Sequence, residues 1–230
     1  MVSPEAFPRL PRREAIGYRL VNSKLPPIHL FDDVADEAEF EALYALQAMT
    51  NPRLLAEAGD LSLLPREAIP FGIPGCSYAT APFTHVNPEG SRFGDGSFGV
   101  LYLADSLTTA IGEVRHHQQR YWQNVPDLHY ERFTFRGLRG RFDEHGVRDA
   151  LGLAGDDPLL SPDDYTASRA LGRAMVEAGE TGIRYPSVRQ PGAACWALMT
   201  PRPVRELIQT QHYEMIWNGR LTEVNRLSSR

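Results

Sequence analysis

The most informative stretch of the chain is residues 90–120, GSRFGDGSFGVLYLADSLTTAIGEVRHHQQR. Its first ten residues contain four glycines, and the apolar run that follows predicts a buried strand over residues 99–104. Ser106 is a suitable N-cap, so we expect a helix that begins there and runs to about Tyr121. This stretch therefore predicts a glycine-rich loop, a strand and a helix in direct succession.

The glycines of this loop match a dinucleotide-binding pattern only as a string of letters. Gly94, Gly96 and Gly99 have the spacing Gly-x-Gly-x-x-Gly, but that motif must follow a strand and open a helix. Here the glycines precede a strand, and the sequence lacks the partner motifs of a protein kinase. The serine-hydrolase, P-loop and helical zinc-protease patterns are also missing. None of these classes, and no metal site, is predicted.

Outside this unit the sequence predicts short elements joined by many turns, because 18 prolines and 19 glycines are spread along the chain. We expect strands at residues 16–21, 128–135, 183–185, 194–199, 204–208 and 212–217, helices at 32–49 and from Ser161 to near Gly179, and long loops at 64–97 and 137–160. The C-terminal third is then mainly strand. One α+β domain fits this order best.

Composition and charge narrow the class of protein further. The chain has 230 residues, 42% of them hydrophobic, which suffices for a core, but no apolar run approaches the ~20 residues of a membrane-spanning helix. Three prolines among the first eleven residues disfavour an export signal, so we expect a cytoplasmic protein without membrane contact. Cys76 and Cys195 indicate neither a disulfide framework nor a zinc site. A net charge of −5 disfavours direct nucleic-acid binding.

Four polar residues stand at positions that suggest more than a structural role. Arg92 lies in the glycine-rich loop, Tyr102 inside the apolar strand, and Glu113 beside the inward stripe of the following helix. Ser187 follows a proline between two predicted strands. Taken singly, each has an ordinary explanation: a solvated arginine, a core tyrosine, a helix-surface ion pair and a turn hydroxyl. Together they suit a nucleotide site.

The sequence strongly resembles the RES domain family, which is named for an Arg, a Glu and a Ser. Two segments carry the resemblance: SRFGDGSFGVLYLADSLTTAIGEVRHH (residues 91–117) and GIRYPSVRQPG (residues 182–192). The residues that match the family name are Arg92, Glu113 and Ser187.

The resemblance implies a fold and an activity. RES proteins are toxins of bacterial toxin–antitoxin pairs that consume NAD+, and their fold resembles that of ADP-ribosyltransferases, with a split mixed β core and surrounding helices. A strand tyrosine and a second arginine also belong to the family's NAD+ pocket, which implies Tyr102 and Arg19 here. YRLVNSKLPPIHLFDD and ALYALQAMTNPRL look like family segments too, so we expect a single RES domain over residues 16–230 after an extended segment, residues 1–15.

The residue types suit cleavage of the bond between nicotinamide and ribose. This cleavage passes through an oxocarbenium-like state that a carboxylate stabilises, and Glu113 is the candidate for that role. A guanidinium suits the pyrophosphate, a role that we assign to Arg92 and, less directly, to Arg19. Tyr102 would stack on the nicotinamide. Ser187 would position the bond rather than attack it, because no base for a serine nucleophile is evident.

The sequence leaves the acceptor of the ADP-ribose open. We favour transfer to a protein, while transfer to phosphate or water would instead deplete NAD+ and shares the same first cleavage. A non-catalytic nucleotide-binding module and, less favoured by the acidic charge, a DNA-binding regulator are alternatives from other classes. The resemblance implies a partner, an antitoxin with an Xre-type helix-turn-helix domain that blocks the NAD+ pocket. His116 and His117 receive no role.

Overall fold

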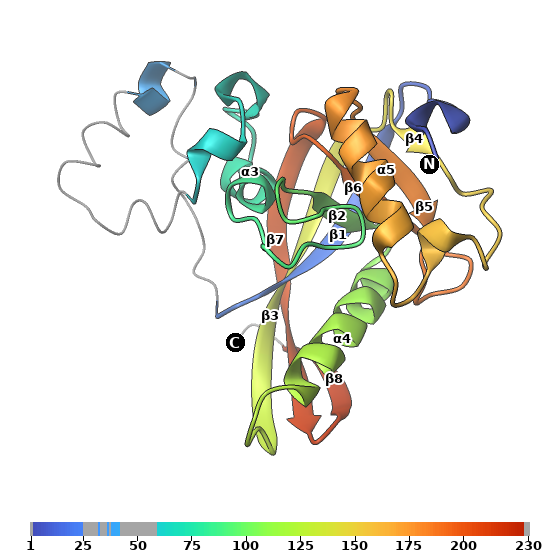
Figure 1. Ribbon diagram of the computed structural model, residues 1–230. Coiled ribbons are helices and arrows are strands. Elements are labelled where there is room, and N and C mark those ends of the chain that lie inside the picture. Colours follow the sequence, from blue (N-terminus) through green and yellow to red (C-terminus); the bar gives the residue numbers. More distant parts are fainter. Residues whose placement is uncertain (1, 25–31, 33–35, 37, 42–58, 228–230) are drawn as a thin grey trace.

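The computed structural model describes residues 2–24, 32, 36, 38–41 and 59–227. Within them, eight strands form one mixed sheet in the order β4-β5-β6-β2-β1-β3-β7-β8, with helices packed on both faces (Figure 1). The strands are β1 (Glu14–Asn22), β2 (Leu101–Ala104), β3 (Tyr130–Asp143), β4 (Arg148–Asp149), β5 (Gly182–Pro186), β6 (Ala194–Leu198), β7 (Val204–Asn218) and β8 (Leu221–Leu227). The helices are α3 (Cys76–Thr84), α4 (Leu107–Gln123) and α5 (Thr166–Glu177), with 3-10 turns η1 (Pro4–Ala6), η2 (Leu61–Leu63), η3 (Arg66–Ala68) and η4 (Pro158–Leu160). The expected α+β class is confirmed.

The sheet consists of two four-stranded parts that meet at one residue pair. β1 is paired with β3 along its whole length, and β2 is paired with β6 along its whole length. Between β1 and β2, in contrast, Tyr18 pairs with Ala104 and the strands then separate. The split core that the family resemblance implied corresponds to this place. Tyr102, one of the predicted site residues, lies on β2 beside this split.

Each face of the sheet carries its own hydrophobic core. Side chains alternate along a strand, so Leu101 and Leu103 belong to one core and Ala104 belongs to the other. The first core is covered by α3, which contributes Phe83. The second is covered by α4 and α5, and the fully buried Leu171 of α5 packs there. The face under α4 and α5 is the one that carries the predicted site.

The predicted start of the central helix is confirmed in atomic detail. The Ser106 side chain accepts a hydrogen bond from the backbone N–H of Thr109 (3.1 Å), as expected of an N-cap. Asp105 accepts a second one from the Thr109 hydroxyl (2.7 Å) and a third from the N–H of Ala194 at the start of β6 (2.7 Å). These bonds tie the first turn of α4 to the neighbouring strand.

Several elements differ from their predicted extent. The strand predicted to end at residue 135 continues to Asp143, and the strands predicted at 204–208 and 212–217 are one strand, β7. A register shift against β3 between Gly137 and Leu138 explains the second case, because it leaves Thr210 as an extra residue that breaks the alternation of side chains. α3 lies inside the predicted loop region 64–97, and β8 was not expected.

The helices predicted at 32–49 and from Ser161, and the N-terminal segment, also differ from their predicted extent. α5 starts at Thr166 rather than at Ser161, because the Ser161 hydroxyl accepts the N–H of Asp164 in a separate turn before the helix. Of the helix predicted at 32–49, residues 38–41 are helical and the rest lies mostly outside the described residues. The segment expected to be extended, residues 1–15, contains η1 and buries Phe7, and β1 already begins at Glu14.

No helix in the described part of the chain combines the length and the apolar character that crossing a membrane would require.

Candidate functional site

Glu113 and Ser187 form the central pair of the site. Glu113 lies on α4, and Ser187 is the first residue after β5; the Ser187 hydroxyl donates to Glu113 Oε1 over 2.6 Å. Ser187 Oγ in turn accepts the backbone N–H groups of Arg189 (3.3 Å) and Gln190 (3.1 Å). Because two donors already point at its oxygen, the single hydroxyl proton is directed at the carboxylate. Ser187 is therefore a fixed donor to Glu113.

Cys195, on β6, lies close to this pair. Its Sγ is 4.0 Å from Glu113 Oε1. Burial, followed by the negative charge of Glu113, raises the pKa of the Cys195 thiol to about 12, so it stays protonated at neutral pH. Burial also raises the pKa of its cross-strand neighbour Tyr185 well above the ordinary value. Cys195 and Tyr185 are thus neutral neighbours of Glu113, and neither supplies a thiolate or a phenolate there.

Tyr102 holds the backbone of the glycine-rich loop from the side of β2. Its hydroxyl oxygen accepts the N–H of Phe93 (2.8 Å) and lies 2.8 Å from Ser91 Oγ, and these two residues flank Arg92. Burial raises the pKa of Tyr102, while the bonds from Ser91 and Phe93 and the nearby positive charge of Arg92 oppose the shift. Tyr102 therefore acts as a neutral phenol that sets the path of the loop on both sides of Arg92.

Arg92 itself is buried, with 7% of its surface exposed. Its Nη1 donates to the carbonyl oxygens of Leu159 (3.3 Å) and Ser161 (2.8 Å), and its guanidinium carbon lies 4.7 Å from the centre of the Tyr165 ring. Both hydrogen bonds use Nη1. Within the described residues the edge formed by Nε and Nη2 has no acceptor, and such an edge can receive two oxygens of an anion.

Arg19 approaches from across the split in the sheet. Its Nη1 donates to the backbone carbonyl of Tyr102 over 3.3 Å. Tyr18 and Leu20, on either side of it, belong to the core under α4 and α5, so alternation places the Arg19 side chain on the other face of β1. Burial lowers the pKa of Arg19 to about 10, which still leaves it charged at neutral pH. Its contact with the site runs through the backbone of Tyr102.

The structure thus brings the predicted residues together in two groups. One is the pair Glu113 and Ser187, and the other consists of Arg92, Tyr102 and Arg19. The two groups are joined by Tyr185, which lies two residues before Ser187 and packs edge-on against Phe93, with 5.0 Å between the ring centres. Sequence reasoning missed Tyr165, because nothing in a lone tyrosine before a helix indicates that it will meet Arg92.

The two histidines on α4 lie one turn beyond Glu113. The rings of His116 and His117 are 5.6 Å apart in an edge-to-face arrangement. His116 is half-buried, and burial, followed by the charges of Arg189 and Arg120, lowers its pKa, which favours a neutral ring. Over the described ranges, no three His, Cys, Asp or Glu side chains are grouped as metal ligands.

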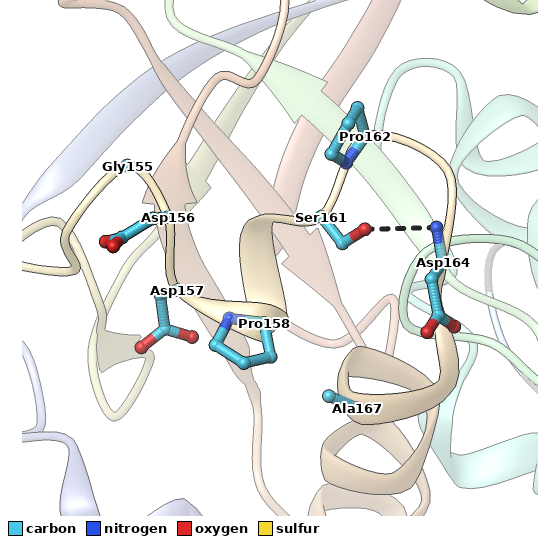
Figure 2. A pocket seen from close by; sticks show the side chains of 8 residues that line it. All are labelled: Gly155, Asp156, Asp157, Pro158, Ser161, Pro162, Asp164 and Ala167. Carbon is cyan, nitrogen blue, oxygen red and sulfur yellow. Dashed lines mark hydrogen bonds between the residues drawn. The ribbon is translucent and has the colours of Figure 1, made fainter.

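Two hollows flank the site. One has a volume of about 340 Å³ and is shown in Figure 2, where the Ser161 hydroxyl bonds to Asp164; its wall includes Ser161, whose carbonyl holds Arg92. The other has a volume of about 390 Å³ and lies between the start of α4 and residues 190–193, next to Ser187. Arg92, Tyr102 and Glu113 do not line either hollow.

Comparison with known proteins supplies independent findings. Residues 69–218 match the family model described as RES domain, a range that includes all the predicted site residues except Arg19. The uncharacterised protein y4oC of Sinorhizobium fredii is 30% identical over 207 residues, which cover 88% of this chain and 83% of that protein. A chain in the crystal structure of the M. tuberculosis MbcT–MbcA toxin–antitoxin complex matches 89% of this chain and 85% of its own length, with 12% identity and a TM-score of 0.46.

Proposed function

The chain belongs to the RES domain family, and on this premise we propose that it is the toxin of a toxin–antitoxin pair that cleaves the nicotinamide–ribose bond of NAD+ and transfers the ADP-ribose to a protein. The observation that carries the proposal is the hydrogen bond from Ser187 to Glu113. It holds a carboxylate in a fixed place among buried neutral groups, where electrostatic stabilisation of a positive transition state is strongest.

Glu113 would act on the ribose. Its Oε1 is held by Ser187, which leaves Oε2 to face the sugar as positive charge develops at the anomeric carbon. Ser187 would contribute by holding that carboxylate rather than by attacking the sugar. Cys195, kept protonated by its raised pKa, does not compete for the reactive carbon.

Arg92 would bind the pyrophosphate. Its Nε–Nη2 edge is the part of the guanidinium without an acceptor among the described residues, and two parallel donors suit two phosphate oxygens. Arg19, on the other face of β1, would support this site indirectly, through its hydrogen bond to the backbone carbonyl of Tyr102. The same free edge would receive a carboxylate from the Xre-type antitoxin that the family resemblance implies, and this would explain how such a partner could block NAD+.

A product assay tests the reaction. Purified protein is incubated with labelled NAD+, with and without phosphate and cell lysate, and we expect nicotinamide release and a labelled protein band. Labelled ADP-ribose 1″-phosphate or free ADP-ribose would show that phosphate or water is the acceptor. NAD+ binding without nicotinamide release would favour the non-catalytic module instead.

The role of Glu113 is tested by Glu113→Gln, which keeps the shape of the side chain and removes its charge. We expect nicotinamide release to fall by roughly a hundredfold or more, as for the loss of one electrostatic stabiliser of a transition state, while NAD+ still binds. Glu177→Gln, at the exposed end of α5, is the matched control and should be fully active. Unchanged cleavage by Glu113→Gln would show that the mechanism is wrong.

A further inference from the structure

One face of α5 lies directly on the glycine-rich loop that carries Arg92. Arg169, Gly172 and Arg173 have the spacing i, i+3 and i+4, so they share this face. A Cβ atom at Gly172 would lie 1.8 Å from the carbonyl oxygen of Phe93, which means that helix backbone and loop backbone are in contact. Arg173 forms an ion pair with Asp95 further along the loop.

Arg169 makes the most specific of these contacts. Its Nη2 donates to the carbonyl oxygen of Glu89 over 2.7 Å, and its Nε donates to the carbonyl oxygen of Ser91 over 3.0 Å. The planar fork of a guanidinium can span two such carbonyls, whereas the point charge of a lysine cannot. Arg169 therefore fixes the loop backbone directly before Arg92.

The loop needs such anchors because its own backbone is permissive. Gly90 and Gly96 have positive φ angles of 77° and 98°, a region that glycine enters without strain and from which it can also leave easily. The loop residues on either side of Arg92 are held by Tyr102 from β2, and by Arg169 and Gly172 from α5. The direction in which Arg92 leaves the backbone is thus set from two sides.

The side chain of Arg92 also rests on α5. Tyr165, the residue before the first turn of this helix, lies under the guanidinium carbon of Arg92 at 4.7 Å and under that of Arg169 at 5.8 Å. The Tyr165 ring thus contacts both Arg92, which we propose binds the pyrophosphate, and Arg169, which anchors the loop of Arg92.

We propose that Arg169 is a positioning residue for NAD+: it holds the loop carbonyls before Arg92 so that the free edge of the Arg92 guanidinium faces the pyrophosphate. This inference rests on the proposed function. Arg169 does not touch the substrate, and its effect on binding is transmitted through Arg92.

The test is a double-mutant cycle on NAD+ affinity in the Glu113→Gln background, where the ligand is not consumed. Arg169→Lys keeps the charge and loses the fork, and we expect the dissociation constant from calorimetric titration to rise about tenfold. Arg92→Lys should weaken binding at least as much, and the double variant should bind no more weakly than Arg92→Lys alone, because both changes act on one contact. Arg220→Lys, an exposed arginine beyond β7, is the control with unchanged affinity.

A purely structural role of Arg169 gives a different result. In that case Arg169→Lys would leave the affinity for NAD+ unchanged, or the double variant would show a rise in the dissociation constant equal to the product of the two single rises. Either result overturns the inference. Should Arg169→Lys melt too early to assay, the same cycle is measured at a temperature below its unfolding transition, where the coupling to Arg92 must still appear. A Glu113→Gln protein that binds no NAD+ would overturn the proposed function itself, whereas binding that Arg169→Lys leaves unchanged overturns only this inference.

Discussion

The proton of the Ser187 hydroxyl has one fixed orientation in the folded protein. Two backbone N–H groups donate to its oxygen, so its proton is left for Glu113. The same residue in solution would rotate freely and could equally accept from a ligand or donate to one. The turn after β5 therefore converts an ordinary serine into a donor that holds the carboxylate proposed for catalysis.

Replacement of this serine should separate catalysis from binding. In Ser187→Ala the carboxylate loses its donor and two backbone N–H groups lose their acceptor, so we expect kcat to fall about tenfold to a hundredfold with little change in KM. The free energy of unfolding should fall by about 1–3 kcal/mol. Steady-state kinetics and urea unfolding measure the two effects. An ADP-ribose adduct on Ser187 in the wild-type protein would contradict this role.

The first turn of helix α4 is tied to the sheet by hydrogen bonds. Ser106 caps it, and Asp105 links it to the start of β6, the strand that carries Cys195 beneath Glu113. The carboxylate of Glu113 stands two turns further along the same helix. The hydrogen bonds at the start of α4 therefore help to place Glu113 relative to β6.

The cap predicts a graded response to substitution. Ser106→Ala removes the acceptor for the N–H of Thr109 and should lower the free energy of unfolding by about 1 kcal/mol. Ser106→Asp supplies another oxygen at the same place and should restore most of that loss. Chemical unfolding of both variants measures the difference, and equal stability of Ser106→Ala and wild type would show that the cap does not limit α4.

For the whole molecule, a buried ion pair joins the N-terminal segment to the sheet. Arg148, on the edge strand β4, donates from Nε to Glu180 Oε2 (3.0 Å) and from Nη1 to the carbonyl of Phe7 (2.9 Å). Arg9 adds a second contact to Glu180 over 2.9 Å. The N-terminal segment is thus fastened to the β4 edge of the sheet.

This cluster predicts a pH dependence of stability. The hydrogen bond from Arg148 is the main cause that lowers the pKa of Glu180 below its ordinary value of 4.5. A lowered pKa means that the folded state favours the ionised carboxylate, so the stabilisation is complete above pH 4.5 and is lost as the pH falls through the folded-state pKa. Glu180→Gln should therefore lower the free energy of unfolding at pH 7 by about 3 kcal/mol and reduce the loss on acidification. Thermal unfolding between pH 3 and pH 7 tests both statements.

Several local features of this fold could be predicted because neighbouring residues alone produce them. The strand of Tyr102, the cap at Ser106 and the helix of Glu113 follow from apolar spacing and from one side-chain oxygen. The merging of two predicted strands into β7 could not be foreseen, because the bulge at Thr210 is set by the register against β3. The predicted roles of Arg92, Tyr102, Glu113 and Ser187 stay predictions, although the structure shows which of these residues contact one another.

The amino-acid sequence alone determined the α+β class, the loop–strand–helix unit and the residue types from which a nucleotide site can be built. Their mutual orientation arose only on folding. Glu113 and Ser187 are 74 positions apart, and Arg92 and Ser161 are 69 apart, so packing of the sheet and of α5 brings each pair together. The physical reason is that helix caps and side-chain periodicity act over a few residues, whereas the direction of a hydroxyl proton or of a guanidinium edge depends on partners that only tertiary packing supplies.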